Sequence, residues 1–136
     1  MARKSSTALA AAALALVLVP SALAGPKTGS SSSLSLAIVA DWNHNGLPNW
    51  NDQVRFDVST TATTEPHVSL KCYQSGSLVY TTQTGYYAGY LWPWTQIMTL
   101  SSIAWSGGAA DCTARLYTFK GSKIVTLKTL SFHVDA

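Results

Sequence analysis

Side chains that carry oxygen recur through residues 41–52, DWNHNGLPNWND, at a spacing that suits a hard cation. Counted from the first residue, carboxylate or amide oxygens occupy positions 1, 3, 5, 9 and 12, on Asp41, Asn43, Asn45, Asn49 and Asp52. Alternate oxygens of this kind can point inward around Ca²⁺, while a glycine at position 6 permits the sharp turn of the loop. Only the first and last of these residues are charged, so we expect any calcium affinity to be weak.

This spacing resembles the calcium loop of EF-hands, and more closely the dockerin variety, which ends in Asp as this stretch does at Asp52. The resemblance implies calcium as the ligand. The residues also allow a second interpretation, an Asn-rich turn whose side chains accept hydrogen bonds from their own backbone. The residues that follow, VRFDVS, alternate apolar and polar, which predicts a strand.

A second candidate surface is the aromatic stretch GYYAGYLWPW at residues 85–94. Glycine and proline interrupt it, so we expect a connection rather than a strand. Its five aromatic residues are Tyr86, Tyr87, Tyr90, Trp92 and Trp94. One interpretation is a contact surface, because Tyr and Trp offer rigid area for stacking on sugar rings or for gripping a protein. The other is structural, with the rings closing one end of the core.

Catalytic chemistry finds little support in the remaining residues. His44, His67 and His133 are scattered without metal-ligand spacing. The chain has no nucleophile elbow and no glycine-rich phosphate loop. Its carboxylates show no pairing typical of a glycosidase. We therefore predict a protein that is not an enzyme and has no cofactor, with calcium at residues 41–52 as the one candidate ion.

The first residues predict export. Arg3 and Lys4 precede an uninterrupted apolar run at residues 8–19, and a small-x-small cleavage motif ends at Ala24. An uncleaved membrane anchor is the alternative, although the run is short for a bilayer. We predict a secreted, extracellular protein with no membrane span after cleavage. The predicted parts are a signal peptide at 1–24, a flexible linker at 25–33 and one domain at 34–136.

The charge balance argues against some partners. The full chain has 9 Lys and Arg against 6 Asp and Glu, a net charge of +3. Without Arg3 and Lys4 the basic residues number 7 against the same 6 acids, and the net charge falls to +1. No basic cluster remains in the sequence, so we expect neither nucleic acid nor an anionic membrane as partner.

The two cysteines, Cys72 and Cys112, most simply form one disulfide in an exported chain. Both lie in stretches that alternate apolar and polar residues, as half-buried strands do. We expect the bridge to pin one strand to another across a thin core. Free thiols or an intermolecular bridge are the alternatives.

Seven short stretches alternate in this way between Leu34 and Ala136, separated by turn signals, and no helical period persists after the leader. A phase slip between Leu127 and Leu130 predicts a bulge in the last strand. With its pair of cysteine-bearing strands, this region resembles an immunoglobulin-like domain, which implies an antiparallel β-sandwich. It is also similar to small secreted proteins of actinobacteria that carry such a domain after a leader.

These patterns predict a secreted adhesion module that presents the aromatic stretch to a glycan or protein partner. The alternative is a structural protein of the cell envelope or extracellular space, with no small-molecule ligand and with calcium as a stabiliser. The sequence does not decide the oligomeric state.

Overall fold

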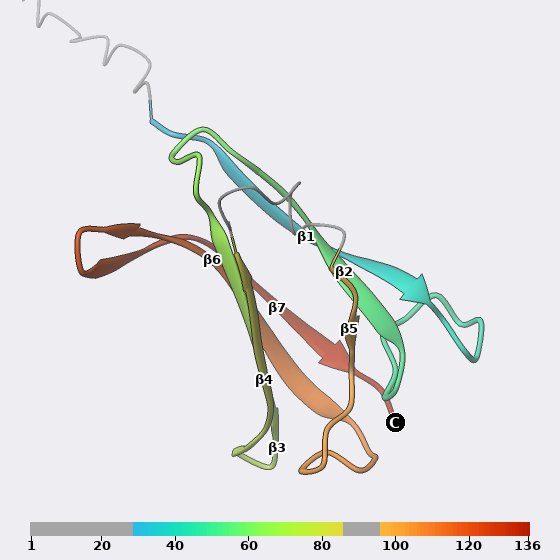
Figure 1. Ribbon diagram of the computed structural model, residues 1–136. Helices are drawn as coiled ribbons and strands as arrows, with labels where there is room; N and C mark the ends of the chain where they lie inside the picture. Colours follow the sequence, from blue (N-terminus) through green and yellow to red (C-terminus); the bar gives the residue numbers. More distant parts are fainter. Residues whose placement is uncertain (1–28, 86–95) are drawn as a thin grey trace, which may run out of the picture.

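The computed structural model describes residues 29–85 and 96–136, which form seven strands and no helix. The strands are β1 (Ser32–Ala40), β2 (Gln53–Thr60), β3 (His67–Gln74), β4 (Ser77–Gly85), β5 (Met98–Thr99), β6 (Ala110–Lys120) and β7 (Lys123–Val134). They make a three-stranded sheet, β1-β2-β5, and a four-stranded sheet, β4-β3-β6-β7, with antiparallel neighbours throughout (Figure 1). The predicted all-β architecture is confirmed, and β1 begins at Ser32, inside the predicted linker.

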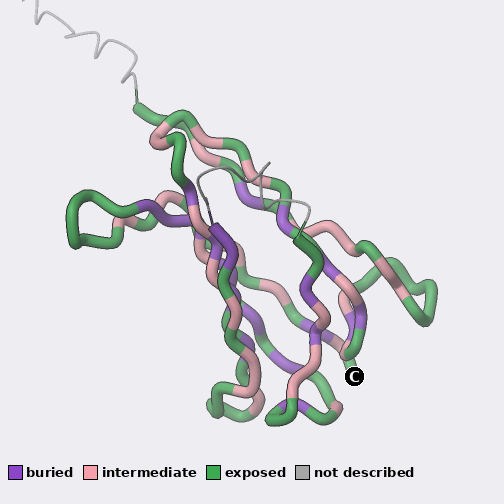
Figure 2. Tube along the Cα trace, in the orientation of Figure 1, coloured by how far each residue is buried: buried purple, intermediate pink, exposed green. Residues whose placement is uncertain are grey.

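Alternation of apolar and polar residues decides which face of each strand enters the core. In β2, Val54 and Phe56 are 0% and 2% exposed, whereas Arg55 and Asp57 lie in solvent. Buried positions recur along strands of both sheets (Figure 2), and most of the buried apolar side chains belong to one hydrophobic cluster. Across that cluster Phe56 of β2 faces Phe132 of β7, with ring centroids 6.5 Å apart. The two sheets therefore share a single core, as in a sandwich.

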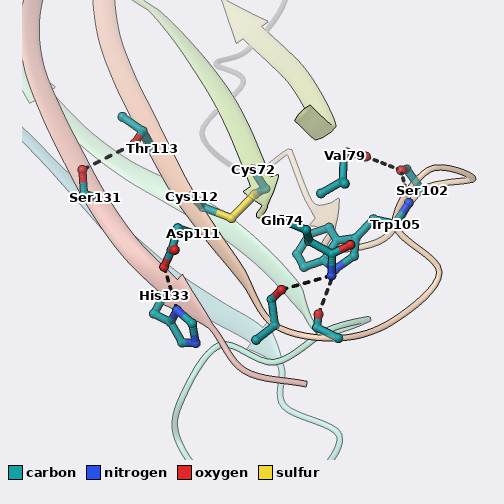
Figure 3. Close-up of a disulfide and its surroundings, with 12 residues drawn as sticks. Cys72, Gln74, Val79, Ser102, Trp105, Asp111, Cys112, Thr113, Ser131 and His133 are labelled. Carbon is teal, nitrogen blue, oxygen red and sulfur yellow. Dashed lines mark hydrogen bonds and ion pairs between the residues drawn. A yellow bond between two sulfur atoms is a disulfide. The ribbon is translucent and has the colours of Figure 1, made fainter. Parts of the chain in front are cut away.

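The disulfide joins Cys72 of β3 to Cys112 of β6, as predicted, but it lies within one sheet (Figure 3). The two residues are directly opposite each other in register, and their Cα atoms are 4.0 Å apart. Opposed residues of an antiparallel pair approach to about 4.5 Å where they exchange no backbone hydrogen bonds, which brings two sulfurs within reach. The expectation of a bridge across the core was therefore wrong, because strand register and not sheet packing brings the cysteines together.

The connection from β5 to β6 contributes a core residue that alternation did not reveal. Trp105 is 0% exposed, and its ring centroid lies 6.2 Å from that of Tyr80. Its indole N–H donates to the carbonyl of Gly108 at 2.9 Å. Its backbone N–H donates to Ser102 Oγ, whose hydroxyl donates to the carbonyl of Val79 on β4 (Figure 3). The sequence gives no sign of this burial, because a tryptophan inside a loop has no periodic neighbours.

Strand β5 is shorter than the sequence indicates. Alternation runs through residues 97–101, but only Met98–Thr99 pair with β2. The next residue, Leu100, still donates its backbone N–H to the carbonyl of Asp52, the residue next in register, at 2.9 Å. The ladder ends there because Asp52 gives its own N–H to Asn49, and Leu100 accepts the N–H of Asn51 instead. Its side chain is 0% exposed, so the predicted inward face is correct although the strand has ended.

Strands β6 and β7 form a long hairpin whose tip extends beyond the rest of the sheet (Figure 1). Lys120 lies opposite Lys123 across the predicted turn. The pairing skips Leu127, because the residues on either side of it pair with consecutive residues of β6. The predicted bulge is thus present, next to the phase slip that indicated it.

Hydrogen bonds tie the two sheets together at both ends. At the end where β3 begins and β4 finishes, the hydroxyl of Thr84 donates to the side-chain carbonyl of Gln96. At the end where β7 finishes, Trp50 donates its backbone N–H to the carbonyl of Asp135 at 2.8 Å. The backbone N–H of Asp135 in turn donates to the carbonyl of Pro48 at 2.9 Å. These contacts hold the connections at fixed positions relative to the core.

Candidate binding surfaces

The Asn-rich loop links β1 to β2 and is built from side-chain hydrogen bonds to its own backbone. Asp41 accepts N–H groups from Gly46 at 2.7 Å and from Asn45 at 3.3 Å. Asn43 and Asn45 each accept the N–H two residues ahead, at 3.2 and 2.7 Å. The N–H groups that Asp41 accepts, that of Gly46 first, lower its pKa below the ordinary value. The left-handed backbone of Gly46, with φ of 74°, completes the turn.

Asp52 anchors the far end of this loop from inside the molecule. It is 1% exposed, and its two carboxylate oxygens accept the N–H groups of Trp42 at 3.1 Å and Asn49 at 2.9 Å. Asn49 is buried as well and donates its amide to the carbonyl of Ala136 at 3.4 Å. Its Oδ1 atom is buried and has no hydrogen-bond partner among the residues that the structure describes. An unsatisfied buried acceptor is costly, so this oxygen suits a cation or a bound water.

The oxygen atoms of the loop are of the type that Ca²⁺ binds, but only two of the five side chains carry a charge. Two carboxylates, Asp41 and Asp52, and three amide oxygens are hard ligands of the kind that Ca²⁺ takes. The described part of the chain contains no group of three or more His, Cys, Asp or Glu placed to hold a metal. The hydrogen bonds from these side chains to the loop backbone are those expected of an Asn-rich turn. They do not prevent cation binding, because a carboxylate or amide oxygen that accepts one hydrogen bond has a further lone pair. Calcium binding at these five residues stays a prediction.

The predicted aromatic surface, Tyr86, Tyr87, Tyr90, Trp92 and Trp94, lies outside the described residues. The residues on either side of that stretch are described. Gly85 is the last residue of β4, and its backbone lies so close to His67 that an added Cβ would sit 2.0 Å from Nδ1. Gln96 is bonded to Thr84, as noted above. Both flanks are therefore held at the end of the sandwich where β3 begins.

An aromatic cluster occupies the same end; its members are His67, Tyr117 and Phe119. The imidazole of His67 stacks on Tyr117 with centroids 5.3 Å apart and meets Phe119 edge-on at 5.2 Å. Tyr117 is 5% exposed beneath it, whereas Phe119 is 50% exposed. Burial in this cluster lowers the pKa of His67, so its neutral form is favoured. The cluster presents an apolar, partly open patch beside the flanks of the aromatic stretch.

The other two histidines lie at the opposite end of the molecule or in the loop. His133 of β7 is exposed, and its Nδ1 lies 2.7 Å from Asp111 (Figure 3). Its Nε2 lies 3.6 Å from Asp135. The hydrogen bond with Asp111 raises its pKa above the ordinary value. His44 is exposed in the Asn-rich loop, where its backbone is left-handed with φ of 59°. Neither position places a histidine next to a nucleophile.

The outward face of the four-stranded sheet carries a shallow polar groove that the sequence did not indicate. Two adjoining hollows of about 360 and 320 Å³ share Ser69, Lys71 and Arg115, from the neighbouring strands β3 and β6. The larger hollow adds Gln83, Tyr117 and Ile124, and the smaller adds Tyr73 and Thr113. The groove therefore runs along β3, with its two cations in the middle.

The two cations of the groove have no acidic partner in the described structure. Neither Lys71 nor Arg115 forms an ion pair, although the chain's six acidic residues all lie within residues 29–85 and 96–136. The guanidinium of Arg115 lies 5.1 Å from the ring centroid of Tyr117, a cation–π contact that orients it. The two residues are far apart in sequence, so only the pairing of β3 with β6 reveals the site. Alternation alone placed both side chains on outward faces.

Comparisons with known proteins add no assignment: no family model, no curated protein and no solved structure matches this chain. Among residues 29–85 and 96–136, none belongs to a helix long and apolar enough to span a bilayer. The features of the described structure that bear on function are therefore the Asn-rich loop, the aromatic end of the sandwich and the groove.

Proposed function

We propose that this chain is a secreted, non-catalytic binding module that presents its aromatic stretch, residues 86–94, to a glycan or protein partner. The observation that carries the proposal is the aromatic cluster at the end of the sandwich where both flanks of that stretch are held. Half-exposed Phe119, backed by His67 and Tyr117, offers ring surface at the same end of the sandwich as the described flanks of that stretch, Gly85 and Gln96. Aromatic faces of this kind stack on sugars and anchor protein interfaces.

The sandwich suits this role as a rigid carrier, and we propose that it is of the immunoglobulin-like class. Named in chain order as A, B, C, C′, E, F and G, the strands form an A-B-E sheet and a C′-C-F-G sheet, which supports that class. The disulfide joins C to F in this chain. The same disulfide supports secretion, since such bonds persist in oxidising compartments, and so does the leader-like start of the sequence.

A glycan and protein array probed with the secreted domain tests the proposal. We expect Trp92→Ala and Trp94→Ala, and to a smaller degree Phe119→Ala, to weaken a detected interaction. Trp42→Ala is the matched control, because Trp42 is 63% exposed in the loop at the opposite end of the sandwich. If all three aromatic variants bind as the unchanged protein does, or if Trp42→Ala weakens binding equally, the aromatic end is not the contact surface.

The long free edge of β7 favours the alternative, a structural protein of the envelope or extracellular space. β7 has 12 residues and, among the strands of residues 29–85 and 96–136, pairs with β6 alone, so its other edge offers backbone groups to a further strand. Sedimentation across a concentration series tests this alternative. Assembly that grows with concentration supports it, and a monomer at every concentration contradicts it.

Calcium as a stabiliser is a separate proposal that rests on the loop and its unpartnered Asn49 oxygen. We expect millimolar Ca²⁺ to raise the melting temperature relative to chelator, because an ion that binds only the folded state stabilises it. The rise should be lost in Asp41→Asn, which removes one of two charges. Equal melting temperatures with calcium and with chelator contradict the proposal.

A further inference from the structure

We infer that the groove on the outward face of the four-stranded sheet binds a carboxylated polysaccharide, with Lys71 and Arg115 as the anion-binding residues. The inference goes beyond the proposed function, because it names a second surface and the chemistry of its ligand. It stands whether or not residues 86–94 bind anything.

Charge is the first step. An unpaired lysine and an unpaired arginine on one sheet face attract an anion, and Arg presents a planar fork that suits a carboxylate. Lys71 lies opposite Thr113, and Arg115 lies opposite Ser69, so the two cations are diagonal neighbours across the β3–β6 pair. Their side chains can therefore reach one carboxylate together or two in succession.

The acidic residue on the same face is already engaged. Asp111 lies further along β6, past Thr113, and its carboxylate is 2.7 Å from Nδ1 of His133. Arg115, at the other end of this run, is oriented instead by the ring of Tyr117. The positive charge of the groove is thus not neutralised from within the molecule.

The lining is the second step, and it favours a sugar polymer over an acidic peptide. Around the cations lie the hydroxyls of Ser69 and Thr113 and the amide of Gln83, which match the hydroxyl groups of a pyranose ring. Tyr73 is 38% exposed at one end and offers a ring face for stacking. The one aliphatic side chain lining either hollow is Ile124, so the groove offers little apolar surface for the side chains of a peptide.

Shape is the third step. The two hollows adjoin at the shared cations, so the groove is elongated along the strand direction rather than closed around one small molecule. An extended chain with a carboxylate on successive sugars would fill both hollows and meet both cations. A uronic-acid polymer has this chemistry.

Titration calorimetry at low salt tests the inference by measuring how tightly the secreted form of the full chain binds polygalacturonate. We expect Lys71→Gln and Arg115→Gln each to weaken binding about tenfold, the loss expected for one charge-assisted hydrogen bond. Arg115→Lys should bind with an affinity between those of the unchanged protein and Arg115→Gln, because it keeps the positive charge but loses the planar guanidinium group. Lys123→Gln, at the tip of the β6–β7 hairpin, is the matched control and should bind unchanged.

Three comparison ligands decide the chemistry of the partner. Neutral dextran should not bind, and poly-glutamate and dextran sulfate should bind more weakly than polygalacturonate. The inference is overturned if no polygalacturonate binding is seen, if the Lys71 and Arg115 variants bind normally, or if Lys123→Gln is equally impaired. Tighter binding of poly-glutamate or dextran sulfate overturns the carboxylated sugar as ligand.

The outcome is separable from that of the proposed function. Trp92→Ala and Phe119→Ala should leave polygalacturonate binding intact, and Lys71→Gln should leave the array partner of the aromatic end intact. Melting curves of each variant confirm that the fold is kept, which is expected because Lys71 is exposed and Arg115 is partly exposed on a sheet face.

Discussion

His67 lies against the backbone of Gly85, and this contact shows how one missing methyl group shapes a molecular surface. The imidazole occupies the space that a side chain at residue 85 would need, and it stacks from there on Tyr117. No sequence pattern indicates the contact, because the two residues become neighbours only when β3 pairs with β4.

Gly85→Ala should therefore destabilise the protein. The new Cβ would lie 2.0 Å from Nδ1 of His67, so the ring or the strand must move. We expect a loss of about 1–3 kcal/mol in the free energy of unfolding, as for other overpacked sites. Urea denaturation measures it. The double variant His67→Ala, Gly85→Ala should show a smaller added loss than the two single changes predict; strict additivity would contradict the steric explanation.

His133 should make stability depend on pH. Its pKa is raised above 6.5 in the folded protein, first by the hydrogen bond with Asp111, so the protonated ring is favoured by folding. A group of this kind adds stability that is fully present below the unfolded pKa and is lost as pH rises through the folded pKa. Melting temperature should thus decline from about pH 6 upward, and less so in His133→Gln. An identical pH profile in His133→Gln would contradict the assignment.

At the scale of the elements, alternation predicted strands well where one face is buried and the other is wet. β2 and β3 follow the pattern residue by residue. β5 does not, because Asp52 gives its backbone N–H to Asn49 and the ladder ends at Leu100, whose side chain stays in the core. A sequence records which side chains are apolar but not where a backbone N–H finds another partner.

Trp105 is the clearest residue that an element-by-element prediction missed, and it should be essential to the β5–β6 connection. Trp105→Ala should cost about 3–5 kcal/mol of unfolding free energy, because a fully buried indole leaves a large cavity. Trp105→Phe should cost less, although it loses the hydrogen bond to Gly108. Chemical denaturation measures both. Trp42→Ala, at a residue 63% exposed, is the control and should be close to neutral; an equal loss there would contradict the argument.

For the whole molecule, composition and cysteine count predicted a disulfide-linked β-sandwich. The pairing of the strands determines which residues become neighbours, and the sequence did not predict it. Cys72 and Cys112 were expected on facing sheets, yet they lie on adjacent strands of one sheet. The same pairing assembles Lys71 and Arg115 into a groove. Both facts depend on strand order, which alternation leaves undetermined because every strand of a sandwich shows the same period.

Removal of the disulfide tests its part in the stability of the whole. The bridge closes a loop with a sequence separation of 40, for which chain entropy predicts about 4 kcal/mol. Cys72→Ala, Cys112→Ala should lose that amount in urea denaturation, while the circular dichroism of the native state keeps its β character. Ala suits both sites because each cysteine is 1% exposed or less. An unchanged denaturation midpoint would contradict the estimate.

The opposed placement of the two ends of the sandwich has a practical consequence for biosensor work. Asp135 bonds to Pro48 and Trp50 beside the Asn-rich loop, whereas Ser31 bonds to Thr61 at the far end, near His67 and Phe119. A chip that captures the protein by a tag after Ala136 will turn the aromatic end toward the analyte. Capture through the amino-terminal side will press that end against the matrix and leave the Asn-rich loop facing the flow.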